Sequence, residues 1–301
     1  AASDVYKRQD DSIEKLIIES FRTEKVIYDQ IEVDINNVHT KYFDVSCVPI
    51  LSKSKKKLQG MVVVLHDITN LQKLENLRRE FVANVSHELK TPITSIKGFA
   101  ETLIEGAKND EQSLDMFLNI ILKESNRIES LVMDLLDLSH IEQQTEIETN
   151  YMNLSELAYN TIDNLQTQAI NKNIEIQPEI EKDVIIEAHE NKIAQVITNL
   201  LSNAINYSLE DNKVIVRVFR EGKKVNLEIQ DFGIGISVKD QKHIFERFYR
   251  VDKARSRDSG GTGLGLSITK HIVEAHNGRI NINSRPVSYT HLRAHETLRY
   301  L

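Results

Sequence analysis

Residues 81–92 read Phe81-Val82-Ala83-Asn84-Val85-Ser86-His87-Glu88-Leu89-Lys90-Thr91-Pro92. An apolar residue recurs every four positions here, which is the spacing of one buried helix face: Phe81, Val85, Leu89 and Ile93. His87 lies roughly 200° around the helix from the nearest members of that stripe, so its imidazole is expected to face solvent beside Glu88. Pro92 interrupts the hydrogen bonds of the helix at a normal cost of about 3 kcal/mol, so we expect a kink just after the histidine. A lone surface histidine is common, so a function for His87 depends on the rest of the chain.

The composition of the chain limits the class of protein to which it can belong. It has 301 residues, of which 40% are hydrophobic and 28% charged, as expected for two or three soluble domains. Its formal net charge of -7 argues against a nucleic-acid-binding surface, and no apolar run approaches the roughly 18 residues that span a bilayer. The single cysteine, Cys47, excludes an internal disulfide framework and a metal site built from thiolates.

Both ends of the chain look foreign to the rest. Residues 4–9 can be encoded by a DNA sequence whose reverse complement, in a shifted frame, encodes residues 287–291 and the start of Leu292. Such an inverted repeat resembles a sequencing adapter that was translated in place, so we interpret residues 1–9 and 286–301 as artefact. A chance match in native tails is the alternative. If the tails are foreign, neither end is a natural boundary, and the lack of an apolar span says nothing about the parent protein.

Residues 10–68 are predicted to form a short helix followed by three strands. Apolar residues alternate around Ile31 and again around Val45, and residues 61–65 form a continuous apolar run. The lysine-rich residues 52–57 indicate a solvated hairpin loop, with a lipid or phosphate patch as the alternative. The last strand ends in Asp67-Ile68-Thr69, and the segment resembles the C-terminal half of a PAS sensor domain. The front half of such a domain is missing, so no ligand can be argued.

A long helix is predicted to begin at Thr69, which forms a capping-box pattern with Gln72. Its apolar stripe continues past His87, and a break at residues 106–110 precedes a second amphipathic helix. Two helices with broad apolar stripes and a short connection form an antiparallel hairpin that cannot bury both stripes alone. We therefore predict that residues 69–146 pair with a second copy as a homodimeric four-helix bundle.

Beyond a polar joint at residues 142–150 the pattern changes to mixed helix and strand. Helices are predicted at residues 154–171 and 193–207, and strands around residues 174–177, 184–188, 214–219 and 225–229. This segregation indicates an α+β sandwich over residues 150–285, with helices on one face of a mixed sheet.

Three motifs in this region have the residue types of a nucleotide site. Asn199 and Asn203 share one helix face, and their carbonyl oxygens suit Mg²⁺ that is also held by phosphates; a merely polar face is the alternative. Residues 231–235, Asp231-Phe232-Gly233-Ile234-Gly235, offer a carboxylate to an exocyclic amine and glycines for close backbone approach, or form an ordinary tight turn. Residues 261–266, Gly261-Thr262-Gly263-Leu264-Gly265-Leu266, open a helix whose amide groups can face an anion, although a dinucleotide-binding turn has similar glycines.

Found together and in this order, the three motifs are more specific for a nucleotide site than any one of them alone. With Phe245-Glu246-Arg247-Phe248-Tyr249-Arg250 between the second and third, they resemble the ATP-binding domain of sensor histidine kinases, in the wider group of the gyrase, Hsp90 and MutL ATPases. Residues 86–92 resemble the phospho-acceptor motif that distinguishes these kinases. The resemblance implies a multi-domain fold: a partial α+β PAS-like domain, an antiparallel helical hairpin in a dimeric four-helix bundle, and an α/β sandwich (GHKL/Bergerat) that binds ATP.

The resemblance implies ATP-dependent phosphorylation of His87, followed by transfer to an aspartate in the receiver domain of a response regulator. A neutral imidazole can attack phosphorus, and Glu88 can accept the proton of its other nitrogen. Thr91 is expected to position water for dephosphorylation of the regulator. Contacts with ATP are implied for Asn199, Asn203, Tyr207, Asp231, Gly233, Gly235, Phe245, Arg250, Gly261, Gly263, Leu264 and Gly265. Mg²⁺ is expected on Asn199 and Asn203, and a cationic lid of Lys253, Arg255 and Arg257 is expected over the phosphates.

The resemblance also implies a location. The order of the three segments resembles the membrane sensor kinases of Gram-positive bacteria that govern phosphate or cell-wall responses. The chain is then the cytoplasmic portion of a protein anchored in the cell membrane by segments outside it. Its expected partners are a second copy and the receiver domain, and no nucleic acid.

Two departures from the family pattern bear on these expectations. Where the first motif usually continues with a lysine, this chain has Asn206, which removes a charge near the phosphates; Arg250 or a lid residue is expected to compensate. The family's sheet normally receives a last strand after the segment that ends near Ser284, and the adapter-like tail replaces it, so we expect an open sheet edge and reduced stability. The alternative function is a non-catalytic or phosphatase-biased dimeric scaffold, and the third is an ATPase that forms no phosphohistidine.

Overall fold

The computed structural model describes residues 11–35, 39–51, 58–143, 148–251, 261–285 and 290–296, the last of these as backbone only. The predictions for the N-terminal tail (residues 1–9), the lysine-rich loop and the cationic lid residues Lys253, Arg255 and Arg257 lie outside the described residues. Contacts divide the chain into two units, Ala1–Val85 and Ser86–Leu301, and each is described by itself.

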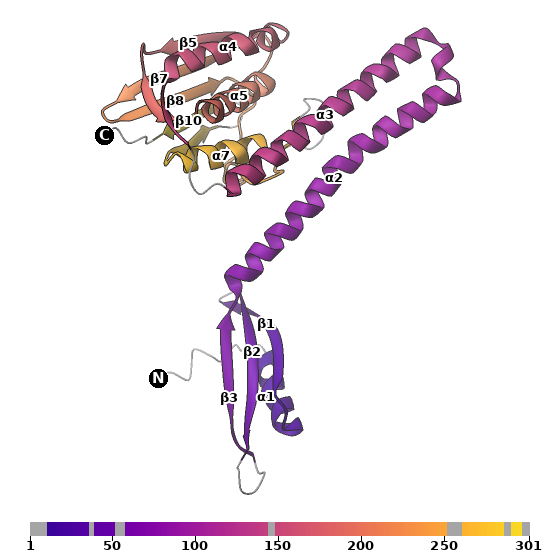
Figure 1. Ribbon diagram of the computed structural model, residues 1–301, viewed down its shortest axis with the longest axis vertical. Helices are drawn as coiled ribbons and strands as arrows, with labels where there is room; N and C mark the ends of the chain where they lie inside the picture. The colour runs from indigo at the N-terminus through magenta and orange to yellow at the C-terminus, as the bar shows by residue number, and fades with distance from the viewer. Residues whose placement is uncertain are drawn as a thin grey trace. The chain divides into compact units, whose positions relative to one another are not determined.

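The first unit is an antiparallel sheet with a helix packed on one face (Figure 1). Its elements are α1 (Asp11–Thr23), β1 (Ile27–Ile35), β2 (His39–Leu51) and β3 (Leu58–Asp67), with the sheet order β1-β2-β3. Alternate strand residues face α1 and form a buried core that includes Leu16, Ile31, Val45 and Cys47. The predicted helix and three strands are confirmed.

Helix α2 (Thr69–Glu105) begins directly after β3 through contacts that differ from the predicted capping box. The Asp67 carboxylate accepts hydrogen bonds from the Thr69 hydroxyl (2.5 Å) and N–H (3.0 Å), and from Lys41 Nζ (3.0 Å). These hydrogen bonds lower the pKa of the Asp67 carboxyl to about 2, and the one from the Thr69 hydroxyl contributes most. The Thr69 hydroxyl also accepts from the Tyr42 N–H (3.0 Å). The prediction of a Thr69–Gln72 box is wrong, because Asp67 supplies the acceptor at this helix start.

Residues 86–92, which include His87, lie in a helical hairpin. Helix α2 continues without a break through His87 and Pro92, and after the short 3₁₀ turn η1 (Ala107–Asn109) helix α3 (Glu111–Gln143) runs back (Figure 1). The rings of Phe99 and Phe117 join the two helices with centroids 5.1 Å apart. The predicted hairpin and its break at residues 106–110 are confirmed.

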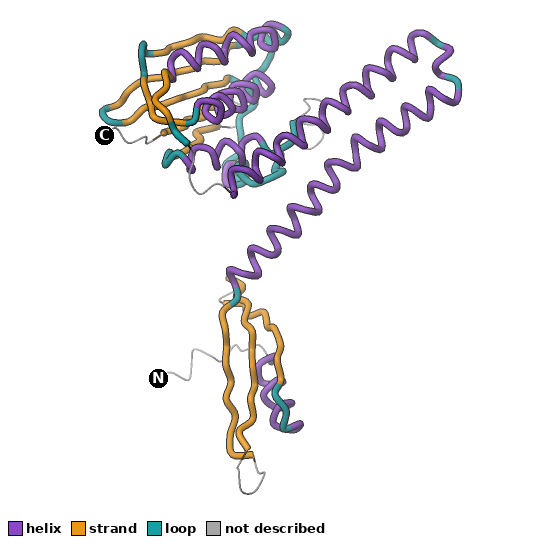
Figure 2. The backbone as a smooth tube through the Cα atoms, viewed as in Figure 1, coloured by secondary structure: helices purple, strands orange, loops and turns teal. Residues whose placement is uncertain are grey.

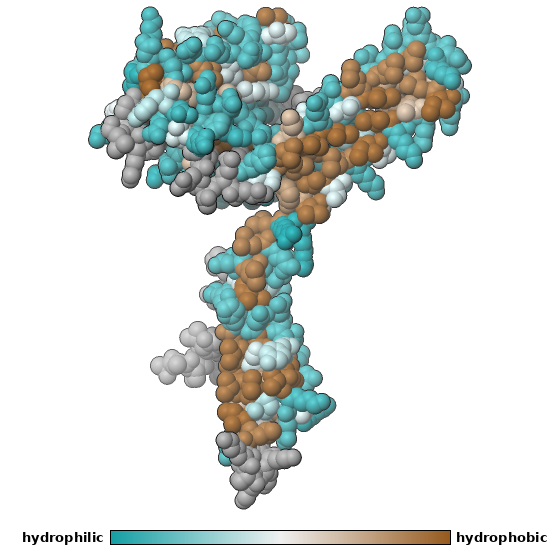
Figure 3. Space-filling model, in the orientation of Figure 1, coloured by the Kyte–Doolittle hydropathy of each residue, from teal (hydrophilic) through white to brown (hydrophobic). Residues whose placement is uncertain are grey.

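Apolar side chains gather along this helix pair, as Figure 3 shows. They remain exposed in the single chain at Ile93, Ile104, Met116, Leu118, Leu122, Val132, Met133 and Leu136. Dimerisation stays a prediction, although the hairpin has the unburied stripes on which it was based. In the part of the chain that the structure describes, no helix combines the length and the apolar character that crossing a membrane requires.

The remainder of the second unit is an α/β sandwich. Its five-stranded sheet has the order β5-β7-β8-β10-β9, in which β5 is parallel to β7 and the other neighbours are antiparallel. The strands are β5 (Glu175–Ile180), β7 (Lys213–Glu221), β8 (Lys224–Asp231), β9 (Arg279–Ser284) and β10 (Thr290–Glu296). A small sheet pairs β4 (Asn150–Asn153) with β6 (Ile185–Ala188).

Three helices cover one face of the large sheet (Figures 1 and 2): α4 (Leu154–Ile170), α5 (Glu190–Tyr207) and α7 (Gly265–Ala275). A short turn, η2 (Asp240–Lys242), lies between β8 and α7 in sequence. The most deeply buried apolar residues of the two central strands alternate along each strand, as expected for a sheet with one face covered by helices. They are Val214, Val216 and Val218 of β7, and Val225, Leu227 and Ile229 of β8. The predicted sandwich is confirmed.

The prediction of an open sheet edge is wrong. The tail segment Thr290–Glu296 forms β10, which pairs antiparallel with β8 on one side and β9 on the other. Leu292 and Ala294 are in register with Ile229 and Leu227 of β8, so their alternation matches the pleat of that strand. The foreign origin of the tail stays a prediction.

Candidate active site

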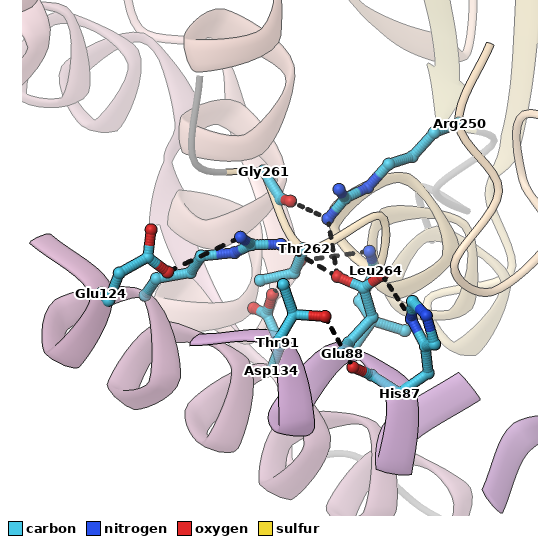
Figure 4. Close-up of polar contacts among 10 residues, drawn as sticks. His87, Glu88, Thr91, Glu124, Asp134, Arg250, Gly261, Thr262 and Leu264 are labelled. Atoms are coloured by element: carbon cyan, nitrogen blue, oxygen red, sulfur yellow. Dashed lines mark hydrogen bonds and ion pairs between the residues drawn. The ribbon is translucent and has the colours of Figure 1, made fainter. Parts of the chain in front are cut away.

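His87 lies on α2 with its side chain 69% exposed, which confirms the predicted solvent-facing position. Its Nδ1 atom is 3.8 Å from Oε1 of Glu88, and Figure 4 shows the carboxylate between His87 and Arg250. The carboxylate therefore faces Nδ1, and a neutral imidazole that carries its proton there has its lone pair on Nε2.

Glu88 is held by two arginines from distant parts of the chain. Its Oε2 atom accepts from Nη2 of Arg127 on α3 at 3.0 Å and from Nη2 of Arg250 at 3.5 Å. The Arg250 guanidinium also donates to the carbonyl oxygen of Gly261 (Figure 4). The Glu88 carboxylate is thus linked through Arg250 to the glycine-rich loop of the sandwich.

Thr91 lies one turn after His87. Its hydroxyl donates to the carbonyl oxygen of His87 at 3.2 Å, so it is fixed to its own helix close to the imidazole (Figure 4). A hydroxyl in this place can also accept from water.

The first nucleotide motif lies on α5 beside the start of α7. Asn199 and Asn203 are partly exposed, and Asn199 Nδ2 donates to the carbonyl oxygen of Gly265 at 3.2 Å. This contact orients the Asn199 amide, so that its oxygen is the atom left for a cation. Tyr207, at the end of the same helix, is 39% exposed.

The chemistry of these amides fits Mg²⁺ with phosphate ligands. Within the described residues, no group of three or more His, Cys, Asp or Glu could hold a metal ion. Mg²⁺ commonly keeps several waters and takes its other ligands from a few protein groups and the nucleotide phosphates. Amide oxygens of Asn199 and Asn203 suit such a site, whereas an all-protein metal cage has no candidate ligands among the described residues.

Asp231 ends β8 and is buried. Burial raises the pKa of its carboxyl to about 6, although the N–H of Gly233 donates to Oδ1 at 2.9 Å and opposes the rise. A side chain at Gly233 would bring its Cβ within 2.3 Å of the carbonyl oxygen of Tyr207, so only glycine fits. The motif therefore brings an orientated carboxylate to the end of α5.

The third motif contacts the segment that precedes it. Gly263 has a φ of +76°, and a Cβ there would lie 3.0 Å from Phe248 Cα and 3.3 Å from Arg250 Nε. The Phe248 N–H donates to the Gly263 carbonyl oxygen at 2.9 Å. The glycine thus allows this loop to pack against the segment that carries Arg250.

The remaining predicted residues lie around these contacts. Gly235, with a φ of +72°, follows Asp231 by four residues, and Phe245, which follows η2 in the sequence, is half-buried. Leu264 is fully buried immediately before α7, with Gly265 directly after it and Gly261 three residues before it. The predicted residues of α5, β8 and α7 are thus neighbours in the fold.

Polar contacts between α3 and the sandwich were missed by the sequence reasoning. Thr262 Oγ1 donates to Asp134 at 2.5 Å, while Lys192 Nζ (2.9 Å) and Gln195 Nε2 (2.7 Å) donate to Asp137. Burial, followed by the charge of Asp137, raises the pKa of Asp134, and the Thr262 hydrogen bond opposes this rise. The Thr262 contact holds the glycine-rich loop beside α3, and the Lys192 and Gln195 contacts hold α5 there.

Asn206 faces α4. Its amide accepts from Gln168 Nε2 at 3.2 Å and donates to Ser202 Oγ at 3.4 Å. Lys172 Nζ donates to the backbone carbonyl of Asn206 at 2.7 Å, so a cation lies at the end of α5 although the position itself is neutral. Arg250, which was expected to compensate, contacts Glu88 and Gly261.

Two family models match the chain. The His Kinase A (phospho-acceptor) domain matches residues 77–144, and the histidine kinase-, DNA gyrase B-, and HSP90-like ATPase matches residues 188–298. Together they cover the helix hairpin and most of the sandwich, β10 included.

Similar proteins agree with these matches. Sensor protein kinase WalK of Staphylococcus aureus is 43% identical over 227 residues, which are 75% of this chain and 55% of WalK. The chain thus spans about half the length of this relative. The solved structure of histidine kinase ThkA in complex with response regulator protein TrrA is 25% identical, with a TM-score of 0.60, and the match covers 95% of this chain and 83% of ThkA.

Acinetobacter baumannii histidine kinase AdeS is also 25% identical, with a TM-score of 0.57 over 71% of this chain and 98% of AdeS. These likenesses agree with the geometry, in which a phospho-acceptor helix and an ATPase sandwich share the carboxylate of Glu88. The chain thus contains a phospho-acceptor domain and an ATPase domain of the histidine kinase type, and it resembles the sensor histidine kinases of two-component systems.

Proposed function

We propose that this chain phosphorylates itself on His87 with ATP and passes the phosphoryl group to an aspartate of a response regulator. The observation that carries the proposal is the position of Glu88, which lies between the His87 imidazole and Arg250 of the nucleotide-site segment. The same unit thus holds the nucleophile, its base and the ATPase motifs. The family and the resemblance to WalK support the same reaction.

Each residue has a defined role in this reaction. Nε2 of His87 attacks the γ-phosphorus, so an N–P bond forms while the bond from that phosphorus to the bridging oxygen breaks and ADP leaves. The Nδ1 proton passes to the Glu88 carboxylate, a general-base contribution of about 10²–10⁴-fold in typical cases. Asp231 accepts from the adenine amine, and Arg250 neutralises charge on the phosphates after it leaves Glu88.

Mg²⁺ is part of the proposal. Asn199 and Asn203 would hold it through their amide oxygens, and when bound it supplies neutralisation of the phosphate charge. The Asn199 contact with Gly265 supports this assignment, because it fixes the orientation of one amide.

Incubation with γ-labelled ATP tests the kinase reaction. We expect label that is stable in alkali, labile in acid and absent from His87→Gln. His140→Gln is the matched control, because His140 is an exposed histidine on α3, and it should keep the label. Intact nucleotide binding without label would instead support the scaffold alternative.

A phosphatase activity on the phosphorylated regulator is the second part of the proposal. The hydrogen bond that fixes the Thr91 hydroxyl one turn from the imidazole supports a role for Thr91 in this activity. Thr91→Ala should slow loss of phosphate from the regulator while His87 is still labelled. Equal dephosphorylation rates would remove Thr91 from this role.

The wider assembly is the third part of the proposal. The exposed stripes of α2 and α3 support a homodimer as a four-helix bundle, and the sheet and helix of the first unit support a partial PAS-like domain. The similar kinase ThkA was solved in complex with response regulator protein TrrA, which supports a partner of that kind here. A membrane location of the parent protein rests on the resemblance alone, and fractionation of cells that express the full gene tests it.

A further inference from the structure

We propose that Arg127 is a positioning residue for phosphorylation of His87 and that it acts through Glu88. The inference deepens the function proposed above and rests on it. Arg127 lies on α3, at a distance of 39 residues from Glu88 in sequence, and it contacts no nucleotide motif among the contacts described.

The two oxygens of Glu88 have different neighbours. Oε1 lies 3.8 Å from His87 Nδ1, whereas Oε2 accepts from Arg127 at 3.0 Å and from Arg250 at 3.5 Å. A carboxylate can rotate about its last bond, so a guanidinium fixed to one oxygen determines where the other points. Arg127 therefore turns Oε1 toward the imidazole.

Arg127 is itself fixed. Its side chain is only 11% exposed, and its Nη1 atom lies 3.8 Å from Glu124 Oε2, one turn earlier on α3. That oxygen is buried and has no hydrogen-bond partner among the described residues, so Arg127 is the cation that offsets its charge. Because this cluster is shielded from water, its attraction is stronger than that of an exposed pair at the same distance.

Arg127 and Arg250 differ in what they do during a turnover. Arg250 belongs to the nucleotide segment, and in the proposed reaction it leaves Glu88 for the phosphates. Arg127 lies on the same hairpin as Glu88, so it can keep the carboxylate paired and aimed after Arg250 departs. Without Arg127, Glu88 would lose the partner that holds Oε1 toward Nδ1 at the moment of proton transfer.

The first experiment compares variants in the whole chain by single-turnover labelling of His87 with γ-labelled ATP. Arg127→Gln should lower the rate constant at saturating ATP by about 10- to 100-fold, the usual cost of a misplaced catalytic group, with the KM for ATP unchanged. Arg127→Lys should recover part of the rate, because one ammonium keeps the charge but cannot reach both carboxylates.

Lys97→Gln is the matched control. Lys97 forms an exposed pair with Glu101 on α2 at 3.7 Å, and its loss should leave the rate unchanged. Circular dichroism melting shows whether Arg127→Gln folds; if it does not, Arg127→Lys carries the comparison. A folded Arg127→Gln with the wild-type rate, or an Arg127→Lys no faster than Arg127→Gln, would overturn the inference.

A double-mutant cycle separates positioning from general stability. If Arg127 acts through Glu88, then adding Arg127→Gln to Glu88→Gln should change the rate by no more than about 2-fold. Independent losses that multiply would show a separate structural role and would overturn the inference. A wild-type chain that takes no label refutes the proposed function itself, whereas a labelled wild type with additive losses refutes only the role of Arg127.

Discussion

At the scale of single residues, the buried Asp231 carboxylate is expected to favour nucleotide binding and to reduce the stability of the fold. Burial raises the pKa of its carboxyl to about 6, above the ordinary value of 3.8. The folded state therefore binds the proton more tightly than the unfolded state does, so this group favours folding at low pH and that contribution is lost as pH rises through about 6. At neutral pH the buried charge destabilises the fold, and the adenine contact that we propose for Asp231 would be the compensating use of this charge.

Asp231→Asn is expected to raise the melting temperature at pH 7.5 while weakening nucleotide binding by at least about 10-fold, because an amide is a poorer acceptor than a carboxylate. Melting by circular dichroism and calorimetry with a non-hydrolysable ATP analogue measure the two effects. In the wild type, affinity for the analogue should fall as pH drops through about 6, since the carboxyl then takes up a proton.

Asp240 provides a control, because its pKa shift and the expected change in melting temperature are opposite in sign to those of Asp231. Hydrogen bonds from Ser237 and then Tyr249 lower the pKa of its carboxyl, so its charge favours the folded state at neutral pH. Asp240→Asn should therefore lower the melting temperature and leave nucleotide affinity unchanged. If Asp231→Asn instead lowered the melting temperature and still bound the analogue, its proposed role would be wrong.

The residues that the sequence predicted share one property, which is that each lies in a local motif. Asn199 with Asn203, and Asp231 with Gly233, have spacings that indicate their chemistry before any fold is known. Glu88 and Arg127 are 39 residues apart and Thr262 and Asp134 are 128 apart, so their pairing depends on how helices and loops pack. The spacing of Glu124 and Arg127 indicates an ion pair on one helix, but no local sequence pattern shows that Arg127 also contacts Glu88.

At the scale of elements, β10 is where the sequence interpretation failed. The origin of the tail does not decide whether it pairs, because strand pairing uses backbone N–H and C=O groups that almost any residue supplies. The alternation of Leu292 and Ala294 opposite Ile229 and Leu227 was the available signal. The strands and helices around it were predicted correctly because their apolar periodicity is long and regular.

Removal of β10 tests its contribution. A chain that ends at Arg285 leaves β8 and β9 without their shared neighbour, so it should melt roughly 5 °C lower or more. Nucleotide affinity should also fall, because Thr290 is paired with Asp231 at the end of β8. A chain that ends at Glu296 keeps β10 and is the control; equal melting of the two chains would show that the strand adds no stability.

At the scale of the whole molecule, the exposed apolar stripe of the hairpin points to assembly. Leu118, Leu122, Met133 and Leu136 share one face of α3 and remain exposed, as do Ile93 and Ile104 on one face of α2. An apolar surface of this kind is costly in water and marks an interaction site. A second copy of the hairpin carries the same stripe and can cover it.

We expect sedimentation velocity to show a dimer for the wild type and a monomer for Leu122→Asp, because burying an unpaired carboxylate at the centre of that stripe is strongly unfavourable. Tyr159→Asp is the matched control, since Tyr159 is an exposed apolar residue on α4 at 45% exposure, comparable to Leu122 at 58%. Both variants should keep the wild-type circular dichroism spectrum, because neither side chain is in a core. A wild type that sediments as a monomer at tens of micromolar, or a Leu122→Asp that stays dimeric, would remove the helical hairpin as the dimer interface.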